Sequence, residues 1–146
     1  MENHLSRGAF GHERLTVYRL AVELYGIVLG FAPEVGARNG ALAEQLRYAA
    51  AAIVLQVAEG AGELSPRAKS RAYRLALRSV SECAAALDLS AMVVRGTVEW
   101  PEGARSTLHG ILGLLTRMAN DWGGNGPAPR RGDDVEPAGE RVSRSA

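Results

Sequence analysis

Residues 47–82, RYAAAAIVLQVAEGAGELSPRAKSRAYRLALRSVSE, decide the predicted fold. An apolar, alanine-rich run is followed by a break that contains Gly60 and Gly62, and then by a second run that carries four arginines. Apolar residues recur at helical spacing on both sides of the break. The stretch therefore predicts two long helices joined by a short turn.

The helix before the break is expected from about Gly40 to Glu59, with Asn39 as its N-cap. Gly60 or Gly62 is expected to end it in the left-handed conformation that glycine adopts readily. At 100° per residue one face of this helix is apolar and predicts its buried side. That face consists of Leu46, Ala49, Ala50, Ile53 and Val57.

The helix after the break is expected to begin with Ser65 as N-cap and Pro66 as first helical residue, and to reach about Arg95. It would be about 45 Å long at 1.5 Å per residue. Its predicted core stripe consists of Tyr73, Ala76, Val80, Cys83 or Ala84, Leu87, Ala91 and Val94.

Two further helices flank this pair. The first begins near Glu13 and is expected to end near Ala32, because Pro33 disfavours helix at the residue before it. Its apolar face is Val17, Ala21, Leu24, Val28 and Phe31. The fourth is expected to start at Trp100, Pro101 and Glu102 and to run to about Trp122. Its residues at bundle spacing are Ala104, Leu108, Ile111, Leu112, Leu115, Met118, Ala119 and Trp122.

Four helices of similar size with short connections predict an all-α, antiparallel up-down-up-down four-helix bundle. Residues 13–122 would form the bundle, and residues 1–12 a flexible N-terminus. Residues 123–146 are rich in glycine, proline and charge, so we predict a disordered tail there.

Composition narrows the functional classes. The 146 residues carry a net charge of +1, so a polyanion partner can be argued only from local clustering of charge. The single cysteine, Cys83, excludes an intramolecular disulfide, and no apolar run is long enough to span a bilayer. We expect a soluble, cytoplasmic protein that has no contact with a membrane.

The outward side of the helix at 40–59 carries an apolar band where a solvent-facing surface is expected to be polar. This apolar band consists of Tyr48, Ala51, Ala52 and Leu55. It continues on the outward side of the next helix with Leu89 and Met92. Such a band predicts an interface between subunits of a homo-oligomer. The alternative is that the small alanines tolerate water and only the large side chains need an explanation.

The helix after the break carries four arginines at spacings of four, three and four residues, so they share one side of it. We call these residues the arginine line: Arg67, Arg71, Arg74 and Arg78. With Lys69 nearby and no acid between Ser65 and Ser81, the arginine line could contact the phosphates of RNA or DNA. It could equally be a solvated face, or form intersubunit salt bridges to Glu44, Glu59 or Glu63. Because no aromatic side chain shares the arginine-bearing side of the helix, the sequence argues against base stacking and against sequence-specific recognition of single strands.

No catalytic or metal-binding pattern is found. A di-metal centre in a helical bundle needs Glu-x-x-His pairs, and none precedes His4, His12 or His109. Cys83 lies on a predicted core stripe and is interpreted as a small buried hydrophobic residue. The sequence therefore predicts a protein without enzymatic activity, cofactor, metal or small-molecule substrate.

Three segments resemble a bacterial family known as four helix bundle proteins, first noticed as products of intervening sequences in 23S ribosomal RNA genes. LTVYRLA at 15–21 is similar to the family opening L-x-V-[YW]-x-x-A. The second segment is similar to the family pattern L-R-R-A-A-x-S-I-x-x-N-I-A-E-G, through Leu46 and Arg47, Ile53, and VAEG at 57–60. RLALRSVSE at 74–82 is similar to L-x-I-A-x-G-S-x-x-E, with Arg78 in place of the family's glycine.

The resemblance implies a homo-oligomer, since similar proteins form ring-like homopentamers. A related branch, the accessory variability determinants of diversity-generating retroelements, presents a basic surface to a reverse transcriptase and nucleic acid. We therefore expect a non-enzymatic, pentameric scaffold that contacts nucleic acid or a nucleic-acid enzyme through its arginines. The alternative is a protein-binding adaptor whose arginines pair with carboxylates of a neighbouring subunit.

Overall fold

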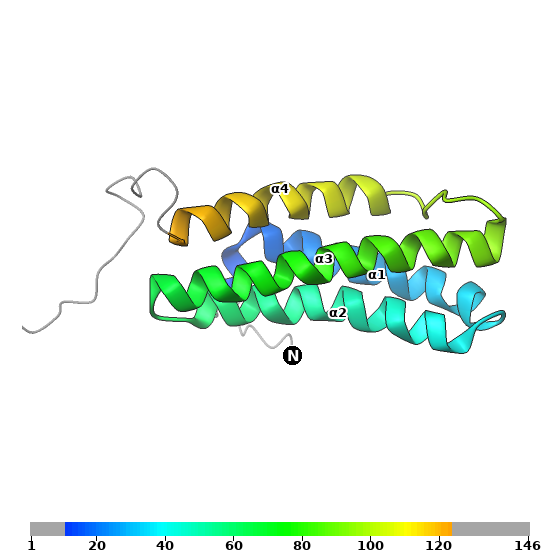
Figure 1. Cartoon of the computed structure of the whole chain (residues 1–146), viewed down its shortest axis with the longest axis horizontal. Helices are drawn as coiled ribbons and strands as arrows, with labels where there is room; N and C mark the ends of the chain where they lie inside the picture. Colours follow the sequence, from blue (N-terminus) through cyan, green and yellow to red (C-terminus); the bar gives the residue numbers. More distant parts are fainter. Residues whose placement is uncertain (1–10, 124–146) are drawn as a thin grey trace, which may run out of the picture.

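The computed structural model describes residues 11–123, which form a short 3-10 helix, Gly11–Arg14, and four α-helices. These are α1 (Thr16–Gly36), α2 (Gly40–Gly62), α3 (Pro66–Arg95) and α4 (Ala104–Trp122). Each helix packs against its neighbours in the chain, α1 also packs against α4, and the most extensive contact joins α2 and α3. Figure 1 shows the resulting up-down bundle, so the predicted fold class is confirmed.

The core contains the faces that the apolar spacing predicts. Every residue predicted for the inner faces of α1 and α2 is buried. In α3 the choice between Cys83 and Ala84 is resolved in favour of Cys83, while Ala84 and Val94 are half-buried. In α4, Leu112 is exposed, and Met118 and Trp122 are half-buried. The predicted helical periodicity therefore identifies most of the core, although Val35, Leu42 and Ala43 are buried without having been predicted.

Two predicted helix ends are wrong. Helix α1 continues through Pro33 to Gly36, because the proline lies in the last turn and removes only one helical hydrogen bond while Val35 gains complete burial. Helix α2 continues to Gly62, and neither Gly60 nor Gly62 has a positive φ angle. The predicted N-caps Asn39 and Ser65 are confirmed, since each side chain accepts a hydrogen bond from a backbone N–H of its own helix.

The start of α4 is also later than predicted. Gly103, at φ +81°, is the N-cap, and the turn before it is closed by the Ala104 N–H donating to the Pro101 carbonyl. Trp100 lies outside the helix, where its indole N–H donates to Asp88 of α3 at 2.7 Å. Proline therefore belongs to the turn and not to the first helical turn.

The N-terminal prediction for residues 1–10 and the tail prediction for 124–146 lie outside the described residues. Gly11 and His12, which the sequence assigned to a flexible lead-in, belong to the 3-10 helix, and the His12 ring packs edge-on against Tyr18 at 4.7 Å. Among residues 11–123, no helix is both long enough and apolar enough to cross a bilayer.

Gly60 has a packing role that the sequence did not indicate. A Cβ atom at this position would lie 2.5 Å from Cε1 and 2.8 Å from Cδ1 of Tyr73, whose ring is buried between α2 and α3. A methyl group would therefore overlap the ring. The absence of a side chain at Gly60 allows α2 and α3 to approach closely at this end of the bundle.

Replacing Gly60 by alanine is expected to lower the free energy of unfolding by about 1–3 kcal/mol, because the buried Tyr73 ring must move. Urea unfolding followed by circular dichroism measures this change. Gly62→Ala is the matched control, since no atom lies within 4 Å of a Cβ there, and it should change stability by less than about 1 kcal/mol. Equal effects of the two substitutions would contradict the packing role.

Candidate functional site

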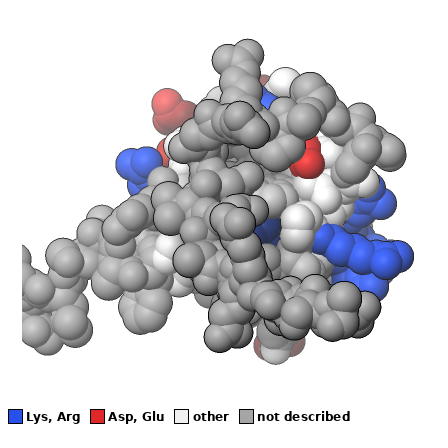
Figure 2. Space-filling model, turned by 90° about the vertical axis from the view of Figure 1, so that its left-hand side faces the viewer, with Lys and Arg blue, Asp and Glu red and all other residues white. Residues whose placement is uncertain are grey.

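The four residues of the arginine line border one groove, about 620 Å³ in volume, between the first half of α3 and the C-terminal end of α4. All four are exposed. Figure 2 looks onto this end of the bundle and shows Lys and Arg side chains gathered on one side of it. The remaining lining residues are Pro66, Ser70, Leu75, Trp122 and Gly123.

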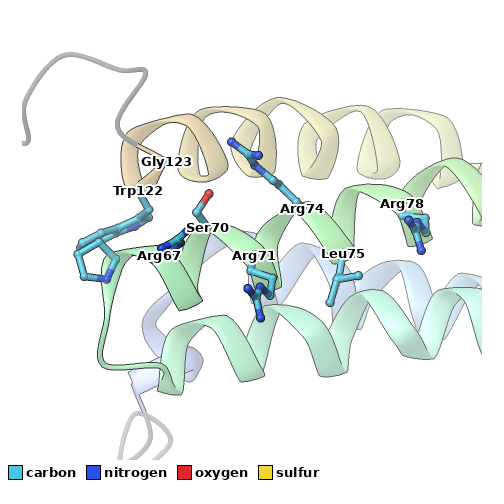
Figure 3. Close-up of a pocket in the computed structure, with 9 residues that line it drawn as sticks. Arg67, Ser70, Arg71, Arg74, Leu75, Arg78, Trp122 and Gly123 are labelled. Atoms are coloured by element: carbon cyan, nitrogen blue, oxygen red, sulfur yellow. The ribbon is translucent and has the colours of Figure 1, made fainter.

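The arginine side chains diverge although their Cα atoms follow one helix face. Figure 3 shows Arg74 turned toward α4, and Arg71 and Arg78 pointing away from it. Arg74 reaches the last turn of α4, where a Cβ on Gly123 would lie 3.0 Å from its Nη2 atom. The C-terminal carbonyl groups of α4 carry partial negative charge, so this position suits a guanidinium group.

Within residues 11–123, none of the four guanidinium groups forms a hydrogen bond or an ion pair. Glu59 and Glu63 share a second groove, of about 360 Å³, with Arg67 and Arg71, but they form no ion pair with these arginines. The arginine line therefore has donors that no described carboxylate occupies. Glu44, the third acid considered as a partner, is exposed on the first half of α2 and lines neither groove.

Lys69 does not extend the arginine line, although the sequence placed it nearby. Its Nζ atom donates to the carbonyl oxygens of Gly60 and Ala61, both at 3.2 Å, and lies 5.6 Å from the centroid of the Trp122 ring. The ammonium group thus binds the C-terminal carbonyls of α2, where a positive charge opposes the negative end of the helix dipole. Lys69 therefore binds the end of α2 beneath the groove, and its charge is not available to a ligand in the groove.

Trp122 was predicted for the inner face of the fourth helix, but it is half-buried and lines the groove of the arginine line. The arginine-bearing side of α3 carries no aromatic residue of its own, but the end of α4 brings this indole to the start of α3. The Ser70 hydroxyl fixes this junction by donating to the Ala119 carbonyl at 3.0 Å. The antiparallel order of α3 and α4 was the available signal, since it places the last residue of α4 beside the first turns of α3.

The residues of the predicted apolar band lie on the surface formed by α2 and α3. Tyr48 is 73% and Leu55 68% exposed, and Leu89 and Met92 are also exposed, while Ala51 and Ala52 are half-buried. Tyr48, Ala52 and Leu89 line a groove of about 460 Å³ whose other residues are Gln45, Ala49, Glu82, Ala85 and Ala86. The structure therefore brings three of the six residues into one groove and leaves Ala51, Leu55 and Met92 outside it.

The described residues contain no group of three or more His, Cys, Asp or Glu side chains that could hold a metal ion. His109 lines a different groove, with Trp100 and Arg105, and His4 lies outside the described residues. Cys83 is completely buried, and this burial raises the pKa of its thiol to about 12. The thiol is therefore protonated at neutral pH, as expected for a residue that serves packing.

No family model matches the chain, and neither a curated protein nor a solved structure is significantly similar to it. The resemblance to the intervening-sequence family thus remains a prediction. The four-helix, all-α architecture that the resemblance implies is present.

The Cys83 thiol is expected to resist modification in the folded protein, because the reactive species is the thiolate and a thiol with a raised pKa provides almost none at pH 8. Reaction with a chromogenic disulfide reagent, followed by absorbance, tests this expectation. One thiol per chain should react rapidly in urea and very slowly without it. Rapid, complete reaction of the native protein would show that Cys83 is accessible.

Proposed function

We propose that the protein is a non-enzymatic, homo-oligomeric helical scaffold that contacts nucleic acid, or an enzyme that acts on nucleic acid, through the arginine line. The observation that carries the proposal is the groove of about 620 Å³ bordered by four guanidinium groups with no partner in residues 11–123. A guanidinium group presents a planar set of donors that matches two oxygens of one phosphate.

The arrangement of the charges supports a chain of phosphates over a single anion. Arg67 and Arg78 are eleven residues apart, which corresponds to about 16 Å along the helix axis. A single phosphate cannot contact charges spread over this length, whereas successive phosphates of a nucleic-acid strand can. Each contact would release bound counterions, so affinity would depend strongly on salt concentration.

The family resemblance supports the same proposal. Similar proteins assemble as homopentamers, and the related retroelement accessory proteins present a basic surface to nucleic acid and a reverse transcriptase. We propose membership of the intervening-sequence family and a pentameric assembly on this basis. The exposed apolar band on α2 and α3 supports association independently of the resemblance.

A specific observation favours a second function. Glu59 and Glu63 line a groove together with Arg67 and Arg71, so this surface presents both charges side by side. Two copies related by a two-fold axis could then exchange salt bridges across this surface. In this case the protein would be a protein-binding adaptor without a nucleic-acid role, and the arginines would stabilise the assembly.

Replacing all four arginines by glutamine is expected to abolish nucleic-acid binding measured by fluorescence anisotropy with labelled RNA and DNA. For wild type, four phosphate contacts should weaken binding about 50- to 150-fold between about 50 and about 200 mM salt. The matched control, R19Q/R38Q/R47Q/R117Q, changes the net charge equally at residues outside the groove and should retain binding. No binding by wild type, or equal binding by both variants, would refute the proposal.

The same quadruple variant separates the two functions. If the arginines form intersubunit salt bridges, the mass of this variant in multi-angle light scattering will be lower than that of wild type, and neither protein will bind nucleic acid. If they bind phosphates, the mass will equal that of wild type. A loss of both properties would indicate that assembly is needed to present the arginines.

Introducing charge into the apolar band is expected to dissociate the oligomer. L55D/L89D buries two carboxylates in the proposed interface, and because both leucines are exposed in the monomer, its fold should be preserved. Light scattering should change from a multiple of the chain mass, five for a pentamer, to the mass of one chain. L64D/V98D is the control, since both residues are exposed in loops away from the band, and unchanged mass in both variants would contradict the interface.

A further inference from the structure

The groove of the arginine line ends at an aromatic side chain. Trp122 is the only aromatic residue among the nine that line it, and it lies near the first turn of α3, next to Arg67 in Figure 3. An indole ring beside guanidinium groups differs from a plain basic surface, because it offers an apolar face that phosphates do not use. This combination is typical of sites that bind both the backbone and a base of a nucleic acid.

The end of α4 that carries the indole is held against α3. The last turn of α4 is tied to α3 by the Ser70 hydroxyl, which donates to the Ala119 carbonyl, and the same carbonyl accepts from the Gly123 N–H at 3.1 Å. The Lys69 ammonium group lies 5.6 Å from the ring centroid. Trp122 is half-buried and lines the groove, so part of the residue remains accessible to a ligand.

An arginine charge accompanies the indole. Arg74 lies against Gly123, the residue that follows Trp122, and Arg67 lies at the same end of the groove. Arg71 and Arg78 extend the charge along α3 away from the indole. A ligand that places an aromatic ring at Trp122 would therefore place its anionic groups on these arginines.

We infer that the groove binds single-stranded nucleic acid, with one base packed against Trp122 and the adjoining phosphates on the arginine line. This inference rests on the proposed nucleic-acid function and specifies its ligand. In a duplex every base is stacked and paired, so no base face is available to the indole, whereas a single strand can turn a base outward. A volume of about 620 Å³ lies within the range of small-molecule sites, so the open groove has room for one nucleotide.

One aromatic side chain also predicts little sequence preference. Every base has an aromatic face, so stacking alone discriminates weakly between bases. The lining residues offer Ser70 as the only uncharged side chain with a polar hydroxyl or amide group, and its hydroxyl is already bonded to Ala119. Recognition should therefore depend on strandedness and charge and hardly on base identity.

Tryptophan fluorescence tests the inference directly, because the chain has two tryptophans and W100F leaves Trp122 as the only one. Trp100 lines a different groove, so W100F should bind nucleic acid as wild type does. Titration with oligothymidylate should quench the remaining fluorescence, whereas a duplex of equal length should not. Circular dichroism checks that W100F keeps its helices after losing the hydrogen bond to Asp88.

Anisotropy with W122A and W122F gives the second measurement. W122A should weaken binding of oligothymidylate at least about fivefold, the lower end of the effect of removing one stacking side chain, and leave duplex binding unchanged. W122F retains an aromatic face and should recover most of the affinity. If W122A unfolds, the W122F result and the quenching of W100F still decide the question.

The outcomes separate this inference from the function on which it rests. Equal affinity of wild type and W122A for oligothymidylate, or equal quenching of W100F by single strand and duplex, would overturn the base contact while leaving nucleic-acid binding intact. Absence of binding to either ligand by wild type would overturn both. Quenching by single strand alone, together with the W122A defect, would support both.

Discussion

The close packing of α2 against α3 at Gly60 and Tyr73 is the contact on which the candidate site depends. It sets where the first turns of α3 lie, and Lys69, nine residues after Gly60, then reaches back to the carbonyl groups that end α2. The next residue of α3, Ser70, donates its hydroxyl to the Ala119 carbonyl at the end of α4. Two neighbouring side chains of α3 therefore join three helices at the end of the bundle where the arginine groove opens.

This arrangement explains how a nearly neutral chain presents a concentrated positive surface. The net charge is only +1, but Glu59 and Glu63, which share a groove with Arg67 and Arg71, lie on the α2 side of the arginine line, and the groove toward α4 is lined by no acid. Coulomb interactions between exposed charges are screened within about 10 Å in ordinary salt. A ligand in the groove would therefore respond to the local arginines more than to the total charge.

Helix α3 carries two different outward surfaces along its length. Its first half bears the arginine line, and its second half contributes Leu89 and Met92 to the exposed apolar band. Under the proposed function the two surfaces have different roles. The second half of α3 binds another copy of the chain, and the first half stays available for a partner. A rigid helix of 30 residues then fixes the distance between assembly and binding surfaces in every copy.

The sequence by itself determined the helical fold, the buried faces and the residues of the arginine line. These features depend on the 3.6-residue period and on local caps such as Asn39 and Ser65, which are properties of short segments. It failed at the ends of α1 and α2 and at the start of α4, because burial of Val35, packing of Tyr73 on Gly60 and the Gly103 turn involve contacts between segments or backbone angles.

Only the tertiary structure decided what surrounds the arginines. Lys69 points inward, Arg74 points to the end of α4, and Trp122 lies in the groove although it comes 44 positions after Arg78 in the chain. The physical reason is that a helix period specifies which residues share a face of one helix. The side chains that meet across two helices depend on their lengths, their antiparallel order and the packing that sets their separation.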